Sequence, residues 1–171
     1  MLFRSQGAFV VSTNSSFGVD NGQPANYPLW CAFYDSLGRE GILSAGAGPN
    51  NNVNIDVVGD IPTTCPSNFL LAVTNTTNTD AKNSGAGYGV INMDLGAPGT
   101  SILSTIPTSN YGLLTGTSMA TPQVAGAIGL LHAGASSIFI NLMKNDPDSA
   151  ALLFKQFILS SVDTLPSLTG I

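Results

Sequence analysis

The segment at residues 116–126, GTSMATPQVAG, constrains the fold of this chain more than any other. It places Ser118 between a glycine turn and a run of small and apolar residues, a pattern that predicts a closely packed helix. Ser118 would then lie at a helix N-terminus, where unpaired N–H groups favour developing negative charge. Pro122 is expected near the first turn, where its missing N–H costs little. A serine N-cap on a core helix is the simpler interpretation, and a serine nucleophile is the chemical one.

Strands and helices alternate along the rest of the chain. Compact apolar runs bounded by turn residues predict strands, and apolar residues at helical spacing predict helices. The expected strands are 8–11, 41–45, 69–73 and 90–93, with a turn at 96–99 and a hairpin at 101–106 and 111–114; the expected helices are 29–37, 119–133, 138–144 and 149–161. This order predicts a layered α/β fold with a mostly parallel sheet. The helix that carries Ser118 is expected to be the longest buried one.

Composition excludes several classes of protein. The 171 residues are 43% hydrophobic and 9% charged, which is too apolar for a disordered chain. Five Lys and Arg residues and a net charge of −5 argue against nucleic-acid binding. The longest apolar helix is short and interrupted by Gln123, so no membrane span is expected. The first residues also lack the pattern of a signal peptide.

Four segments carry a family resemblance. The string at 116–126 closely resembles the nucleophile segment of subtilisin-like serine proteases, the subtilases. Residues 14–18 resemble a wall of the substrate pocket in that family, residues 43–50 resemble the strand and loop before its oxyanion-hole asparagine, and residues 95–105 resemble the Gly-Ala-Pro-Gly segment before its nucleophile. Each motif is ordinary alone, but their order and spacing extend the resemblance from Phe9 to about Pro166. The resemblance implies a three-layer subtilisin-like α/β fold with a mostly parallel sheet, of which residues 1–171 are part of one catalytic domain.

The resemblance also implies roles for individual residues. Ser118 would be the nucleophile of a serine endopeptidase, and Asn50 would donate its side-chain amide to the oxyanion. Asn50 is followed by two further asparagines, and a plain polar turn is the alternative interpretation of such a triplet. Ser16, Phe17 and Gly18 would bind substrate, as one wall of the S1 pocket. Gln123 stands where the family commonly has a histidine that is not the catalytic base.

A general base for Ser118 is missing. The only histidine, His132, is fourteen residues further along the same expected helix, which corresponds to about 21 Å of axial rise. Subtilases carry their triad in the order Asp, His, Ser. The chain therefore resembles the C-terminal part of a catalytic domain without its N-terminal Asp- and His-bearing half, and we expect it to be inactive alone. A non-catalytic subtilase remnant or peptide-binding module is the alternative, and an unrelated α/β hydrolase is weaker because no Gly-x-Ser-x-Gly motif is present.

The resemblance implies a polypeptide substrate, an extracellular location and a partner in the missing N-terminal half of the domain. We expect no cofactor and no nucleic-acid or membrane partner. Subtilases often carry structural calcium, but the aspartates of this chain show no spacing typical of a calcium loop, so no metal site is placed. These aspartates are expected to be turn or surface residues: Asp20, Asp56, Asp60, Asp80 and Asp94.

Two cysteines, Cys31 and Cys65, permit one disulfide or two free thiols, and their number does not decide between these. In the subtilase interpretation both flank the same side of the cleft, and secretion would allow oxidation. The resemblance therefore predicts a disulfide between them. It also predicts that the bond between Cys65 and Pro66 is cis, because a loop proline at this place is often cis in the family.

Overall fold

A parallel four-stranded sheet organises the chain in the computed structural model, which describes residues 7 and 9–170. The strand order is β1-β3-β5-β6, and all neighbouring strands in it are parallel. The strands are β1 (Ser12–Ser15), β3 (Leu43–Ala47), β5 (Leu70–Thr76) and β6 (Leu95–Pro98). The predicted α/β class with a mostly parallel sheet is therefore confirmed.

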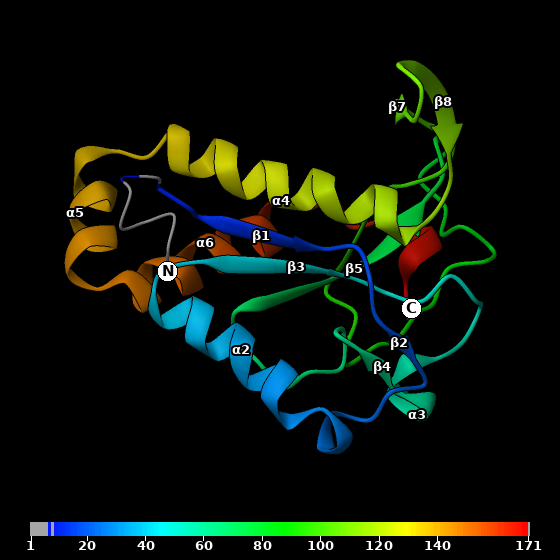
Figure 1. Cartoon of the computed structure of the whole chain (residues 1–171), viewed down its shortest axis with the longest axis horizontal. Coiled ribbons are helices and arrows are strands. Elements are labelled where there is room, and N and C mark those ends of the chain that lie inside the picture. Colours follow the sequence, from blue (N-terminus) through cyan, green and yellow to red (C-terminus); the bar gives the residue numbers. More distant parts are fainter. Residues whose placement is uncertain (1–6, 8, 171) are drawn as a thin grey trace.

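Helices cover both faces of this sheet. Helix α4 (Thr117–Ala133) crosses one face and α2 (Pro28–Arg39) lies on the other (Figure 1). Successive residues of a strand point to opposite faces. In β5, Leu71 therefore joins the core under α4, whereas Leu70 joins the core under α2. Phe154 of α6 (Pro147–Ser161) closes the first core at one end.

Shorter elements surround this framework. Strands β2 and β4 pair antiparallel, and β7 and β8 form a hairpin that projects beyond the N-terminal end of α4 (Figure 1). These remaining elements are β2 (Val19–Asp20), η1 (Pro24–Asn26), α3 (Ile55–Val58), β4 (Asp60–Ile61), β7 (Ile102–Ile106), β8 (Asn110–Leu114), α5 (Ser137–Asn145) and η2 (Pro166–Leu168). The hairpin and the four predicted helices are confirmed, with boundaries that differ by a few residues.

The first expected strand is displaced along the sequence. It was expected at 8–11, but β1 begins at Ser12. Ala8 lies outside the described residues, and Phe9 is 65% exposed. The first residue pair of the sheet is Ser12 with Leu43. The N–H of Leu43 donates to the carbonyl of Val11, the residue just before β1. The polar residues of β1 are tolerated because their side chains bond across the sheet: Thr13 donates to the Ser44 hydroxyl at 2.8 Å.

The strand expected at 90–93 is wrong. The N–H groups of Ile91 and Asn92 donate to the carboxylate of Asp56 at 3.0 and 2.9 Å, so they take no part in a sheet ladder. The fourth strand is β6 instead, where a turn was expected. Pro98 is accommodated because it ends a strand at the edge of the described sheet.

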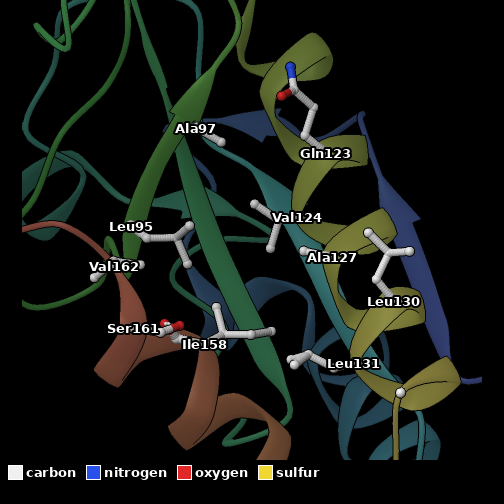
Figure 2. Close-up of a pocket in the computed structure, with 11 residues that line it drawn as sticks. Leu95, Ala97, Gln123, Val124, Ala127, Leu130, Leu131, Ile158, Ser161 and Val162 are labelled. Carbon is white, nitrogen blue, oxygen red and sulfur yellow. Dashed lines mark hydrogen bonds between the residues drawn. The ribbon is translucent and has the colours of Figure 1, made fainter.

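Helix α4 is buried on its sheet side only. Ala120, Val124 and Ile128 are buried, whereas Leu130 is 76% exposed. Ser118 thus lies at the start of the longest described helix, as expected, and burial is confined to one side of that helix. One flank of α4 borders a groove of about 540 Å³ shared with β6 and α6 (Figure 2). The groove has mostly apolar walls: Leu95, Ala97, Val124, Ala127, Leu130, Leu131, Ile158 and Val162.

Within the described part of the chain, no individual helix has the length and apolar character needed to cross a membrane. Helices α4 and α5 meet that length and composition only when taken together, and they are bent by 110° where they join.

Cys31 of α2 and Cys65 form a disulfide with a Cα–Cα distance of 5.1 Å, which confirms the predicted pairing. The bridge ties α2 to the loop between β4 and β5, and both cysteines belong to the core under α2. The cis prediction for Cys65–Pro66 is wrong, because the cis bond lies at Ile61–Pro62. This loop contains two X-Pro bonds, and residue types alone do not distinguish them.

We predict that replacing both cysteines, in the variant Cys31→Ser/Cys65→Ser, lowers the free energy of unfolding by about 3–4 kcal/mol. The bridge closes a loop with a sequence separation of 34, which limits the freedom of the unfolded chain. Urea unfolding followed by circular dichroism measures the change. Reductant should destabilise the wild-type chain to the same extent and leave the variant unaffected; a wild-type chain that is insensitive to reductant would contradict the prediction.

Candidate active site

Ser118 is the second residue of α4 and is half-buried. Its Oγ donates a hydrogen bond to the carbonyl of Ser16 at 3.3 Å, and the Oγ of Ser16 donates to the carbonyl of Ser118 at 3.0 Å. The second bond has a local cause. Pro122 was expected near the first turn and lies inside α4, just beyond that turn. Its ring nitrogen cannot donate to the carbonyl four residues earlier, that of Ser118. The free carbonyl accepts from Ser16 instead, so the serine is held against the segment after β1.

Asn50 lies in the loop after β3, and its side chain is oriented by the start of α4. The Oδ1 atom of Asn50 accepts from the backbone N–H of Thr117 at 3.0 Å and from the Thr117 hydroxyl at 3.2 Å. A backbone N–H can only donate, so the atom that faces it must be the amide oxygen. The Nδ2 end of Asn50, with its two donors, therefore points away from this contact.

Ser118 and Asn50 line the same small pocket of about 80 Å³. The N–H of Ser118 is among the first N–H groups of α4, which have no acceptor within the helix. Together with Nδ2 of Asn50 it supplies the kind of donors that stabilise an oxyanion, and the helix dipole adds to their effect. The structure thus brings the predicted nucleophile and the predicted oxyanion donor to one place.

The three residues predicted to bind substrate form a wall of this pocket. Ser16, Phe17 and Gly18 all line it, and Phe17 is 62% exposed with its ring 5.8 Å from that of Trp30. Glycine is required at position 18, because a Cβ there would lie 2.1 Å from the carbonyl oxygen of Ile61. This close approach lets β4 complete the far side of the pocket.

Asp60 was expected at the surface, but it is only 2% exposed and lines the same pocket. Burial is the main cause that raises the pKa of Asp60 to about 6. A hydrogen bond from Thr63 lowers this pKa in part, and the negative charge of Asp20 raises it further. Asp20 lies directly opposite Asp60 in the β2–β4 pair. Residue spacing alone gave no sign of this burial, because it depends on pairing between strands forty positions apart.

His132 lies at the other end of α4 from Ser118. Its Nδ1 is 2.9 Å from the carbonyl oxygen of Ile128, and its ring stacks on Phe154 with 3.9 Å between ring centroids. Burial lowers the pKa of His132, although the contact with Ile128 opposes this change. These contacts place His132 in the packing between α4 and α6, remote from the pocket.

Two further expectations concern Gln123 and a structural metal ion. Gln123 projects from α4 and donates to the carbonyl of Pro98, which links the helix to the end of β6. In the part of the chain that the structure describes, no three or more His, Cys, Asp or Glu residues gather as a metal ligand set would. The described residues therefore do not indicate where a calcium ion would bind.

A layered α/β fold and a serine on a helix N-terminus are features shared with serine hydrolases. The chain belongs to the subtilase family, because the model of that family matches residues 4–166. Thermitase of Thermoactinomyces vulgaris is 40% identical over 131 residues, covering 74% of this chain and 41% of the relative. Subtilisin E of Bacillus subtilis is 39% identical over 120 residues, covering 69% of this chain and 29% of the relative.

Solved structures agree with this assignment. A cold adapted subtilisin-like serine proteinase superposes with a TM-score of 0.66 and 26% identity, covering 97% of this chain and 54% of that one. The prenylagaramide maturation protease PagA superposes with a TM-score of 0.70, covering 98% of this chain and 57% of that one; at 22% identity it shows the fold alone. The chain thus spans less than half the length of the two curated relatives named above and little more than half of these structures.

We predict that Asp60→Asn stabilises the folded chain at pH 8 and has little effect at pH 4. The pKa of Asp60 rises from 3.8 to about 6 on folding, so ionising this buried group costs stability as the pH increases through that interval. The cost is small at pH 4 and approaches about 3 kcal/mol above pH 6. Thermal unfolding at the two pH values measures it, with Asp163→Asn as the control at an exposed carboxylate. An equal change in melting temperature at both pH values would contradict the prediction.

Proposed function

We propose that this chain supplies the nucleophile and the oxyanion hole of a secreted serine endopeptidase. The observation that carries the proposal is the single pocket shared by Ser118, at the start of α4, and Asn50, whose amide oxygen is held by Thr117. In the proposed reaction Ser118 Oγ attacks the carbonyl carbon of a peptide bond. The negative charge that develops on the carbonyl oxygen is stabilised by Asn50 Nδ2 and the Ser118 N–H. We assign no cofactor or metal to this step.

The substrate is proposed to be a polypeptide bound along the segment from Ser16 to Gly18. This segment follows β1 directly, lies beside Ser118 and forms one pocket wall. An extended peptide there would place its scissile carbonyl close to Ser118. The Cys31–Cys65 disulfide supports the extracellular part of the proposal, because disulfides persist in oxidising compartments.

The general base is proposed to come from a partner segment. Serine attack requires a group within hydrogen-bond reach that removes the Oγ proton. The only histidine of this chain is held between α4 and α6. Strand β1 is at the edge of the described sheet, and a segment bearing the family's Asp and His would extend the sheet there. The limited coverage of the relatives supports this arrangement.

A peptide-binding module without catalysis is the second candidate. The position of His132 favours it, because this residue cannot act on Ser118 from the far end of α4. The two candidates differ in one measurable outcome, namely hydrolysis after an Asp- and His-bearing segment is supplied.

We predict that the chain alone does not hydrolyse a fluorogenic peptide at a measurable rate, and that an upstream segment with the family's Asp and His restores turnover. Loss of the histidine alone costs about 10⁶ in kcat in subtilisin, a member of this family. The segment is tested both fused upstream and as a separate fragment. Ser118→Ala should abolish the restored turnover, whereas Ser104→Ala, at an exposed serine of β7, should not.

Two results would count against the protease proposal. A restored protein that binds peptide but never cleaves it would favour the binding module. Robust turnover by the bare chain, lost in His132→Ala, would show that the base has been assigned wrongly.

We predict that Asn50→Ala lowers kcat of the restored enzyme by about 10²–10³ with a smaller change in KM. This loss in kcat is the one that follows removal of an oxyanion-hole donor in subtilisin, which belongs to the same family. The substitution removes the amide donor from the pocket but leaves Ser118 in place. Asn52→Ala is the matched control, because the Asn52 side chain accepts from Lys82 at 2.9 Å and does not line the pocket. Equal effects of the two substitutions would refute the role of Asn50.

A further inference from the structure

We propose that the pocket beside Ser118 selects a positively charged substrate side chain, arginine or lysine, with the Asp60 carboxylate as the specificity-determining group. The inference rests on the proposed function, because it assigns a substrate class to the same pocket.

The pocket contains charge of one sign only. Its ionisable lining residues are Asp20 and Asp60, and all the others are neutral: Ser16, Phe17, Gly18, Ala47, Gly48, Pro49, Asn50, Thr117 and Ser118. Asp20 and Asp60 lie opposite each other in the antiparallel β2–β4 pair. Like charges at such positions destabilise a sheet, so the pair lowers stability unless a cation lies near it.

The lysines of the described chain do not neutralise this pair. Lys155 forms an ion pair with Asp94 at 3.6 Å, and Lys82 donates to Asn52 and to two backbone carbonyls. Lys144 lies in the last turn of α5. Around Asp60 itself the contacts are with neutral groups: Thr63 Oγ1 donates to its carboxylate, and Thr64 Oγ1 lies 3.3 Å from its backbone nitrogen.

The lining of the pocket suits a long cationic side chain. The exposed ring of Phe17 forms part of the wall, and an apolar ring can pack against the methylene stem of Lys or Arg while the charged head reaches a carboxylate. Asp60 is the buried carboxylate of the pocket, and a guanidinium or ammonium group there would form a charge-assisted hydrogen bond with it. Asp20 is exposed, and Asn51 Nδ2 donates to its Oδ2 at 3.3 Å, so Asp20 adds attraction from nearer the surface.

The charge of Asp60 also makes the selection depend on pH. Burial raises the pKa of Asp60 to about 6, with the facing Asp20 as a further cause, so the carboxylate is charged at pH 8 and mostly neutral at pH 5. The groups that face Asp60 are Asp20 on β2 and, in the turn after β4, Thr63 and Thr64. A preference for cations should therefore be present at pH 8 and decline as the pH falls through 6.

Binding tests this proposal without catalysis. The probes are acetyl-Ala-Ala-Arg amide and acetyl-Ala-Ala-citrulline amide, whose last side chains have nearly the same shape but differ in charge. Titration of the full chain at pH 8, followed by calorimetry or NMR, should give at least about tenfold tighter binding of the arginine peptide. The difference should be largely lost at pH 5 and in Asp60→Asn, where only the charge of Asp20 remains in the pocket, and it should persist in Asp163→Asn.

Equal binding of the two peptides, or no binding of either at millimolar concentration, would overturn the proposal. The wild-type comparison does not depend on any variant, so it remains decisive if Asp60→Asn fails to fold. Retention of the arginine preference in a folded Asp60→Asn chain would likewise exclude Asp60 as its source.

Cleavage by the restored enzyme separates this inference from the proposed function. An arginine preference in binding, without cleavage of any peptide, would remove the protease proposal and leave the cation site. Cleavage after leucine or phenylalanine that exceeds cleavage after arginine, and that Asp60→Asn does not change, would leave the protease and remove the cation site.

Discussion

The contact between Asn50 and the first residue of α4 is the interaction on which the site depends. The Thr117 N–H donates to Asn50 Oδ1, and the Thr117 hydroxyl donates to the Gly48 carbonyl at 2.6 Å. These bonds satisfy a helix N-terminal donor and join the end of β3 to the start of α4. They leave the Ser118 N–H and Asn50 Nδ2 as the donors available to a substrate. The contact therefore satisfies the first donor of the helix and orients the amide, whereas Ser118 itself is held by its hydrogen bonds with Ser16.

Parallel pairing brings the other parts of the site to this point. Strands β1 and β3 run in register from Ser12–Leu43 to Ser15–Gly46, so their carboxyl ends lie at the same edge of the sheet. The loops that leave these ends carry Ser16 and Asn50. Ligand sites of open α/β sheets lie at this edge for the same reason. Because α4 crosses the sheet with its N-terminus here, the helix dipole also points at the pocket.

The apolar groove of about 540 Å³ is larger than the pocket at Ser118, but it is not the candidate active site. The groove beside α4 and β6 is apolar, whereas the pocket at Ser118 is smaller and contains the donors and carboxylates. Volume measures unfilled space, while catalysis and recognition require charge and hydrogen-bond donors in a fixed geometry. The buried Asp60 illustrates the difference, because it places a carboxylate in a pocket whose volume a neutral residue would also fill.

Local signals in the sequence determined much of this protein. The string around Ser118 specified a helix with a serine at its start, and the alternation of apolar runs and turns specified an α/β sheet and a hairpin before that helix. Tertiary structure decided the burial of Asp60, the hydrogen bonds from the N–H groups of residues 91–92 to Asp56, and the hydrogen bond from Thr117 to Asn50. Each of these joins residues at least thirty positions apart. Periodicity indicates which face of an element is apolar, but it does not indicate which distant groups a side chain will contact. The site is built from such long-range contacts.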